Sequence, residues 1–133
     1  MATSQTEQTH GVAGTDQDFL RQVATLDADE EFCVYSRIWA FPEGADRLAN
    51  MFAETTRLSA FLSGTIHYCM CRDSHDPTLF LLFERYKGRK GFDAHIEQPF
   101  VQGLLAAGLI RHVEASFAKP IQPAKPETDS GEV

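Results

Sequence analysis

The stretch that decides the fold spans residues 65–86 and reads TIHYCMCRDSHDPTLFLLFERY. Its two ends are rich in aromatic and other apolar side chains, whereas its centre, residues 73–77, is a polar cluster that ends on a proline. We therefore predict two antiparallel strands, 65–72 and 78–86, that pair as a hairpin with a longer loop. The elements on either side of this hairpin decide which fold it belongs to.

Upstream of the hairpin the sequence predicts a strand and a helix. Residues 32–41 are aromatic and β-branched, and the Pro-Glu-Gly sequence at 42–44 ends the strand that they predict. Apolar side chains then recur at three- and four-residue spacing, which predicts a helix over about 43–62 with one apolar face. Gly64 follows, and we expect this glycine to close the helix in the left-handed conformation.

Downstream of the hairpin a basic turn leads into two short helices and a last strand. The helices are expected at about 91–97 and from Pro99 to Gly108, and the strand at 109–117. The order of elements is then β-α-β-β-α-β. This order predicts a ferredoxin-like α+β domain over residues 32–118, with an antiparallel sheet and both helices on one face.

The flanks of the domain are acidic. Residues 1–15 are rich in Thr, Gln, Gly and Ser and are expected to be disordered, and residues 119–133 carry three prolines and predict a flexible tail. Residues 16–31 predict an extra N-terminal helix and an acidic linker. The net charge of −7 comes mostly from residues 1–31, which hold seven acids and one base, whereas the domain holds nine of each.

The N-terminal helix carries a start signal and an apolar stripe. Thr15 and Asp18 have the spacing of a capping box. The apolar positions that follow at helical spacing are Phe19, Leu20, Val23 and Leu26. We expect this stripe to dock on the domain or on a partner subunit.

Composition excludes several classes of protein. A domain with balanced charge offers no basic surface to nucleic acid, and no stretch approaches the roughly 18 apolar residues of a membrane span. The polar N-terminus is not a secretory signal, so we expect a cytoplasmic protein. The sequence also lacks a Gly-rich phosphate loop, a nucleophile elbow and metal-ligand spacing.

One face of the sheet has no predicted helix to cover it. By the two-residue alternation of strands, Tyr35, Trp39 and Phe41 share one face of the first strand, and His67 shares a face of the second strand with two cysteines. A bare apolar sheet face needs cover. We therefore predict a homodimer in which two sheets pack against each other.

The three cysteines are Cys33, Cys69 and Cys71. An odd number without secretory context argues against a disulfide framework. Cys69 and Cys71 alternate on one predicted strand, so they point the same way, about 7 Å apart along it. A C-x-C pair binds a metal if other ligands join it; the alternative, which we prefer, is two small apolar side chains and no metal site.

Several short motifs follow one another along residues 32–118. They are the 42–44 turn with Asp46 and Leu48, Ser63-Gly64-Thr65-Ile66-His67-Tyr68, Phe83-Glu84-Arg85-Tyr86, Phe92-Asp93-Ala94-His95 and Pro99-Phe100. Each motif is loose, but in this order and spacing the sequence resembles the antibiotic biosynthesis monooxygenase (ABM) domain family. Members of that family are dimeric α/β barrels.

The resemblance implies a small-molecule pocket between the sheet and the helices of each subunit. The family includes cofactor-free oxygenases that turn polycyclic phenols into quinones, haem-degrading enzymes and isomerases, so the fold does not give the reaction. Leu82 stands where the oxygenases have an asparagine and Leu105 near their arginine, and only Ser36, His95 and Leu105 stand at the haem-degrading positions. We therefore expect no haem, flavin or metal cofactor.

Three residues are the candidates for catalysis: His95, Glu84 and Tyr86. The family places a pocket-facing histidine or aromatic at His95, and histidine takes or gives a proton near neutral pH. The alternative is a half-buried histidine bonded to a backbone carbonyl. Burial raises the pKa of Glu84 unless a partner such as His95 compensates; Glu84 then orients the base, or else is a structural hydrogen-bond anchor. Tyr86 is suited to orient an aromatic substrate.

The residues expected to line the substrate site are Ser36, Tyr68, Leu82, Phe92, Phe100, Leu104 and His67. Tyr68 and His67 alternate, so His67 faces the partner subunit if Tyr68 faces the pocket. Together these residues favour a cofactor-independent enzyme of secondary metabolism that abstracts a proton from an aromatic or polyketide-like molecule, followed by reaction with O2 or by rearrangement. The alternatives are a non-catalytic carrier or stress-associated protein with the same pocket, and a structural dimerisation module.

Overall fold

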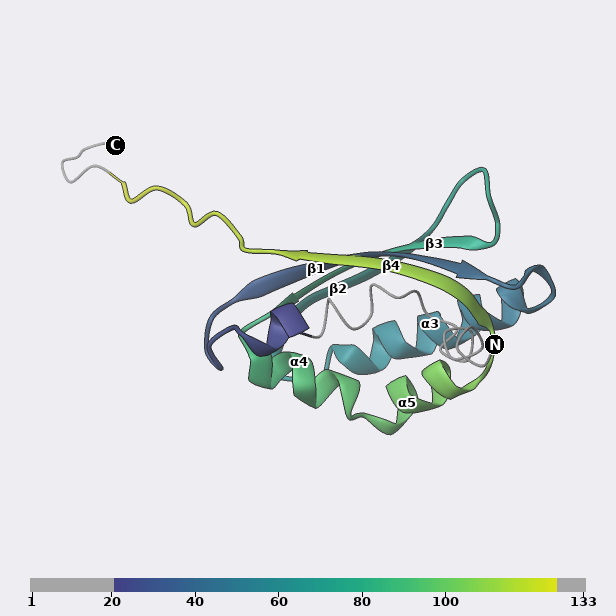
Figure 1. The fold of residues 1–133 in the computed structure, drawn as a ribbon, viewed down its shortest axis with the longest axis horizontal. Helices are drawn as coiled ribbons and strands as arrows, with labels where there is room; N and C mark the ends of the chain where they lie inside the picture. Colours follow the sequence, from purple (N-terminus) through teal and green to yellow (C-terminus); the bar gives the residue numbers. More distant parts are fainter. Residues whose placement is uncertain (1–20, 127–133) are drawn as a thin grey trace, which may run out of the picture.

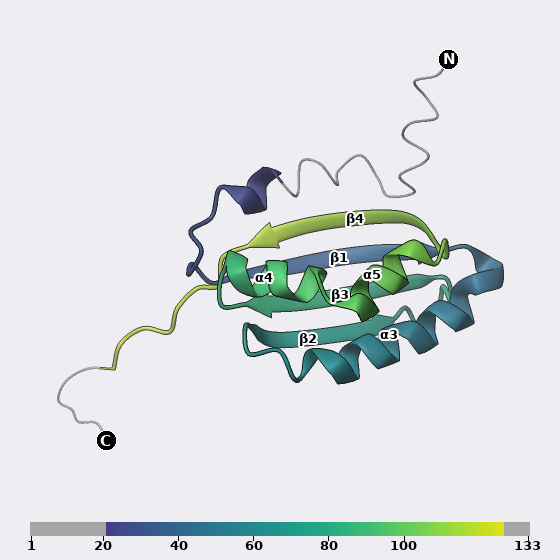
Figure 2. The ribbon, with the colours of Figure 1, turned by 90° about the horizontal axis from the view of Figure 1, so that it is seen from below.

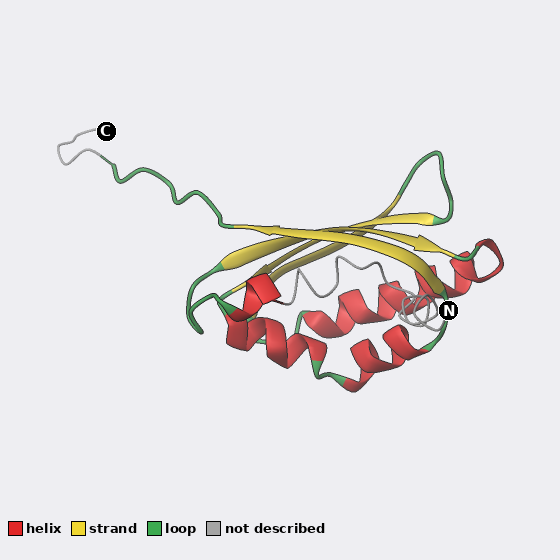
Figure 3. Cartoon of the chain, in the orientation of Figure 1, coloured by secondary structure: helices red, strands yellow, loops and turns green. Residues whose placement is uncertain are grey.

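The structure, a computed structural model, describes residues 21–126. After a helical turn at 21–24, the chain forms a strand, two helices, a hairpin of two strands, two more helices and a last strand (Figures 1 and 3). Their bounds are β1 Phe32–Ala40, the 3-10 helix η1 Pro42–Gly44, α3 Ala45–Ser59, β2 Thr65–Arg72, β3 Leu79–Tyr86, α4 Arg89–Ile96, α5 Pro99–Ala106 and β4 Ile110–Ala118. Every predicted element of the domain is present. None of the helices within 21–126 has the length and apolar run needed to cross a bilayer.

The four strands form one antiparallel sheet in the order β2-β3-β1-β4. β1 lies between β3 and β4, so its backbone is hydrogen-bonded along both edges. In the β1–β3 register Phe32 lies opposite Tyr86 and Trp39 lies opposite Leu79. Helices α3, α4 and α5 all cover the same side of the sheet (Figure 2). This arrangement confirms the predicted ferredoxin-like α+β fold.

The core lies between the sheet and the helices. Alternation along β1 turns Phe32, Val34, Ile38 and Ala40 to this side, where all four are buried. Two clusters result, one of Val23, Leu26, Phe32, Val34, Tyr86 and Phe92, the other of Ile38, Ala40, Ala45, Leu48, Phe52, Phe80 and Leu104. The first cluster lies beneath α4 and supports the candidate site described below.

The segment that precedes β1 packs beside α4. Val23 and Leu26 are 3% and 6% exposed and belong to the first core cluster. Nη1 of Arg89 donates to the carbonyl oxygens of Ala24 and Leu26, at 3.0 and 3.1 Å. The predicted docking of this segment on the domain is confirmed for these residues. The positions Thr15, Asp18, Phe19 and Leu20 lie outside the described residues.

The prediction for Gly64 was wrong. Among residues 21–126 only Gly108, after α5, has a positive φ, at 75°. Gly64 serves a different purpose, because a Cβ atom there would lie 2.6 Å from the Cα atom of Gly91 in α4. The backbone before β2 thus touches the backbone of α4, and a close approach of this kind admits only glycine. Helix α3 ends at Ser59, before the predicted boundary at 62.

The opposite side of the sheet carries no helix, and we call it the open face (Figure 1). Tyr35 is 49% exposed there and Leu81 is 36% exposed. The ring of Tyr35 packs against Phe83 with centroids 5.0 Å apart, and Trp39 packs against His112 at 5.3 Å. This apolar surface supports the predicted pairing of two copies, which remains a prediction.

Candidate functional site

Four polar side chains meet beneath the sheet, and we call them the His95 cluster: Tyr68, Glu84, Tyr86 and His95. Tyr68 comes from β2 and lies opposite Glu84 in the β2–β3 register. Glu84 and Tyr86 share the helix-facing side of β3, as their spacing predicts. His95 reaches them from α4, with its ring centroid 5.1 Å from Tyr68 and 5.7 Å from Tyr86.

Glu84 is the buried carboxylate of this cluster, with 6% of the residue exposed. Its Oε1 accepts a hydrogen bond from the hydroxyl of Tyr86. The same oxygen lies 4.0 Å from Nε2 of His95, which is longer than a hydrogen bond. Burial raises the pKa of Glu84 to about 7, although the Tyr86 hydrogen bond acts in the opposite direction. The carboxyl group therefore exchanges its proton near neutral pH.

His95 is 3% exposed, and its Nδ1 is buried without a hydrogen-bond partner among the described residues. Burial lowers the pKa of His95 to about 4, so the imidazole is neutral at pH 7. No backbone carbonyl of residues 21–126 pairs with this Nδ1, as the structural alternative for His95 would require. A neutral ring with an unpaired nitrogen is free to accept a proton or a hydrogen bond from a bound molecule.

The two tyrosines stay neutral. Burial, followed by the charge of Glu84, raises the pKa of Tyr86 and of Tyr68 well above the usual range. Tyr86 therefore acts as a hydrogen-bond donor that holds the carboxylate of Glu84, not as an acid. Within the cluster, Glu84 is the group that gains or loses a proton between weakly acidic and weakly basic pH.

The other predicted site residues fall into three groups. Phe92 and Phe100 border the cluster, since Phe92 packs edge-on against Tyr86 at 5.5 Å and Phe100 lies 6.3 Å from the ring of His95. Leu104 belongs to the second core cluster. His67 lies on the open face with its ring 5.3 Å from Phe83, which agrees with the predicted side. Leu82 packs against the second core cluster on the helix side. Leu82 and Ser36, which pair across β1 and β3, also border a hollow in the open face.

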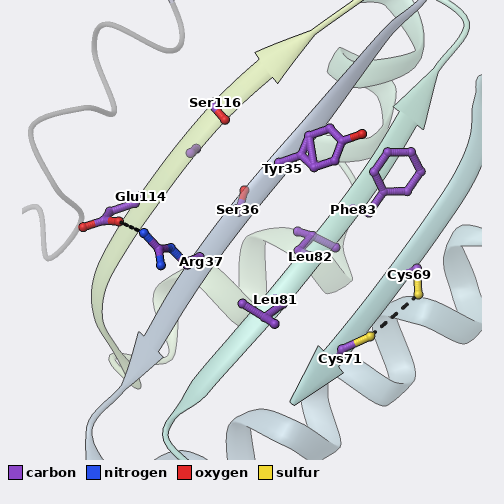
Figure 4. A pocket seen from close by; sticks show the side chains of 11 residues that line it. Tyr35, Ser36, Arg37, Cys69, Cys71, Leu81, Leu82, Phe83, Glu114 and Ser116 are labelled. Atoms are coloured by element: carbon purple, nitrogen blue, oxygen red, sulfur yellow. Dashed lines mark hydrogen bonds and ion pairs between the residues drawn. The ribbon is translucent and has the colours of Figure 1, made fainter. Parts of the chain in front are cut away.

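This open-face hollow has a volume of about 540 Å³ (Figure 4). Its lining residues are Tyr35, Ser36, Arg37, Cys69, Cys71, Leu81, Leu82, Phe83, Glu114, Ala115 and Ser116. The resemblance led us to expect a pocket on the helix side, whereas this hollow lies on the other side of the sheet from His95. Sequence reasoning missed the ion pair at its rim, in which Nη2 of Arg37 lies 3.2 Å from Oε1 of Glu114. Strand alternation, applied to β4 as well as β1, is the signal that finds it.

A sequence model of the family described as antibiotic biosynthesis monooxygenase matches residues 31–103, which run from β1 into α5 and include every member of the His95 cluster. The chain belongs to the antibiotic biosynthesis monooxygenase family. ABM proteins are typically dimeric and bind small molecules. The resemblance inferred from the motifs is therefore confirmed at the level of the family.

Solved structures of ABM-type proteins share the fold. A putative antibiotic biosynthesis monooxygenase from Bacteroides thetaiotaomicron is 18% identical, with a TM-score of 0.66 over 77% of this chain and 100% of that one. A second, from Chloroflexus aurantiacus, is 21% identical, with a TM-score of 0.61 over 72% and 98%. A Pseudomonas aeruginosa protein is 17% identical, with a TM-score of 0.65 over 72% and 99%. Among curated proteins no sequence matches the chain.

Proposed function

We propose that this ABM-family protein is a cofactor-independent, monooxygenase-like enzyme of secondary metabolism. It abstracts a proton from an aromatic or polyketide-like molecule with the help of His95, and the resulting anion reacts with O2 or rearranges. In the oxygen-dependent case a CH2 group and O2 give a carbonyl group and water, so O2 is the only oxidant required. Family membership supports the reaction class.

The observation that carries the proposal is the burial of His95 beside Glu84, with Nε2 and Oε1 4.0 Å apart. Burial leaves the imidazole neutral and raises the pKa of Glu84 to about 7. When His95 takes a proton from the substrate, an ionised Glu84 at 4.0 Å stabilises the imidazolium that forms. Tyr86 holds the carboxylate through its hydroxyl group, which positions Glu84 for this purpose. Burial disfavours a charge on either group alone. The protonated imidazole and the ionised carboxylate together are favoured, because their opposite charges attract.

Access to His95 passes by the outer members of the site. His95 and Glu84 are almost completely buried, whereas Tyr68 and Phe100 are half-buried. An aromatic substrate reaches His95 by displacing or stacking on these two rings, which favour flat, apolar molecules. Because the site is buried and excludes water, the charge of Glu84 acts more strongly on the proton transfer.

An oxygen-uptake assay tests this proposal. The purified protein is incubated with an anthrone or a naphthol under air and under nitrogen, and wild type is compared with His95→Ala. His75→Ala, in the exposed turn between β2 and β3, is the matched control. We expect oxygen-dependent product with wild type and His75→Ala, and a loss of about 100-fold or more with His95→Ala. Product that survives at full rate in His95→Ala removes His95 as the base.

A non-catalytic small-molecule-binding protein, of the carrier or stress-associated kind, is the second candidate. The observation that favours it is the open-face hollow, whose lining includes Tyr35 and Phe83 but neither His95 nor Glu84. Naphthol binding that quenches the single tryptophan, Trp39, with no turnover of any aromatic compound, supports the carrier and counts against the enzyme.

A further inference from the structure

We propose that the segment before β1 positions His95 for the proposed reaction, and we call residues 23–30 the strap. The inference rests on the proposed function, because it concerns the histidine that removes the proton. The strap precedes residue 31, where the match to the family model begins. It is therefore a support for the site that lies outside the matched part of the family domain.

His95 depends on its helix for its place in the site. Its Nδ1 is buried without a hydrogen-bond partner among the described residues, and its Nε2 lies 4.0 Å from Oε1 of Glu84, beyond hydrogen-bond length. The position of the imidazole beside Glu84 is therefore set by ring packing and by where α4 lies. A helix of eight residues is too short to be stable alone in water, so contacts with other segments must fix α4.

The strap and the first turn of α4 satisfy each other's backbone groups. Nη1 of Arg89 donates to the carbonyl oxygens of Ala24 and Leu26, at 3.0 and 3.1 Å, just where the helical turn at 21–24 ends. In return, the backbone amide of Lys90 donates to the carbonyl oxygen of Ala28 at 3.4 Å. No side chain caps this end of α4. The strap thus supplies an acceptor for one of the amides that the first turn of a helix leaves free.

Close packing fixes the same end of α4. A Cβ atom on Gly88, the residue before the helix, would lie 2.0 Å from the carbonyl oxygen of Ala28, so the two backbones touch. The φ of Gly88 is 176°, an extended conformation, so contact with the strap and not strain requires glycine here. Val23 and Leu26 are buried in the core cluster that contains Tyr86. The strap therefore packs with the residue that bonds to Glu84 and also holds the helix that carries His95.

Among the polar contacts of the strap, those of Arg89 matter most. An ion pair between Nζ of Lys119 and Oε2 of Glu30, at 2.8 Å, joins the other end of the strap to the residue after β4. However, 61% of the lysine side chain is exposed, so water screens this pair. A charged donor on a carbonyl oxygen, as in the Arg89 contacts, forms a stronger bond than a neutral donor. Replacing Arg89 is therefore the test of the strap.

Hydrogen exchange measures how firmly the strap holds α4. Arg89→Met keeps the apolar part of the side chain and removes its donors, and Lys90→Met, the control, removes an exposed cation from the same turn. We expect the amides of residues 89–96 to exchange about 10-fold faster or more in Arg89→Met and at the wild-type rate in Lys90→Met. Gly88→Ala, whose Cβ pushes Ala28 away, accelerates the same amides.

The titration of His95, followed by NMR, is the second readout, and a purely structural role of Arg89 leaves it unchanged. The imidazole signal is identified by its loss in His95→Gln. Burial lowers the pKa of His95 to about 4. A loosened α4 admits water, so the pKa rises toward 6.5 in Arg89→Met and in Gly88→Ala. Lys90→Met shows how much of any rise comes from losing a nearby positive charge.

Two results overturn the proposal: unchanged exchange of residues 89–96 in both Arg89→Met and Gly88→Ala, or faster exchange with a His95 titration that stays at the wild-type midpoint. If Arg89→Met does not fold, Gly88→Ala decides alone, with Arg89→Lys, which keeps a charged donor, expected to behave as wild type.

Neither readout requires turnover, so the two proposals fail separately. If wild type makes no product from any aromatic compound while both readouts shift, the proposed function fails and the positioning of His95 by the strap holds. If turnover occurs, Arg89→Met lowers kcat about 10-fold and leaves KM within about twofold, because the strap holds the helix of His95 and not the substrate. A change in KM alone counts against the strap.

Discussion

Replacing Glu84 by glutamine should change how the stability of this protein depends on pH. The pKa of Glu84 is raised in the folded protein from 4.5 to about 7, so the folded state binds this proton more tightly than the unfolded chain does. Its contribution to stability is present below pH 4.5 and is lost as the pH rises through 7. His95 behaves in the opposite way. Its pKa is lowered from 6.5 to about 4, so its contribution is present above pH 6.5 and is lost as the pH falls through 4.

The size of each effect follows from the two pKa values. A tenfold change in proton affinity corresponds to about 1.4 kcal/mol, so each residue alters the free energy of unfolding by about 3 kcal/mol across its range. Between pH 4.5 and 6.5 the contribution of Glu84 to the free energy of unfolding falls with pH and that of His95 rises, so the two changes cancel in wild type. In Glu84→Gln only the His95 slope remains, and the free energy of unfolding should rise by about 3 kcal/mol between pH 4 and 6.5. In His95→Gln it should fall by about 3 kcal/mol between pH 4.5 and 7.

Urea unfolding at fixed protein concentration, followed by the fluorescence of Trp39, measures these curves at each pH. Glutamine keeps the shape of glutamate and an oxygen that accepts the Tyr86 hydrogen bond, so a change in slope reports the lost charge. Glu43→Gln removes an exposed carboxyl group on η1 and serves as the control. If Glu84→Gln and wild type run parallel from pH 4.5 to 7, Glu84 does not titrate near 7 and the account of the site is wrong.

Three further predictions concern activity, packing and assembly. If the proposed reaction occurs, its rate should rise with pH through about 7 as Glu84 ionises, and Glu84→Gln should abolish that dependence; an unchanged pH–rate profile in the variant counts against the role of Glu84. Gly64→Ala should lower the free energy of unfolding by about 1–3 kcal/mol, because its Cβ would meet Gly91 at 2.6 Å. Gly103→Ala, with nothing within 4 Å of its Cβ on α5, should raise the free energy of unfolding by up to about 1 kcal/mol, and thermal unfolding separates the two outcomes. Leu81→Glu, on the open face, should shift a dimer toward monomer in sedimentation velocity; an unaltered dimer places the interface elsewhere.

Much of the site could be predicted from the sequence. The alternation along β3 places Glu84 and Tyr86 on one face, and the alternation along β2 places Tyr68 on the matching face. The structure brings both together with His95, which the sequence indicated through a motif on the next helix. The sequence suggested His95 as the partner of Glu84, whereas in the structure Tyr86 donates the hydrogen bond to Glu84 and Nε2 of His95 lies 4.0 Å from Oε1. The distance between a strand and a helix depends on how the helix packs, which the sequence does not show.

Local periodicity determined the order of the elements and the face on which each side chain lies. The sequence predicted a strand at 65–72, and β2 runs from Thr65 to Arg72. The side chains of a strand alternate whatever the strand packs against, so this prediction does not depend on the rest of the fold. Only the tertiary structure decided which of those faces is buried. The contact of Gly64 with Gly91, the pKa of Glu84 and the exposure of the Cys69–Cys71 pair all depend on where α4 and the other helices lie. Contacts between segments far apart in the chain set these properties, and no local pattern records them.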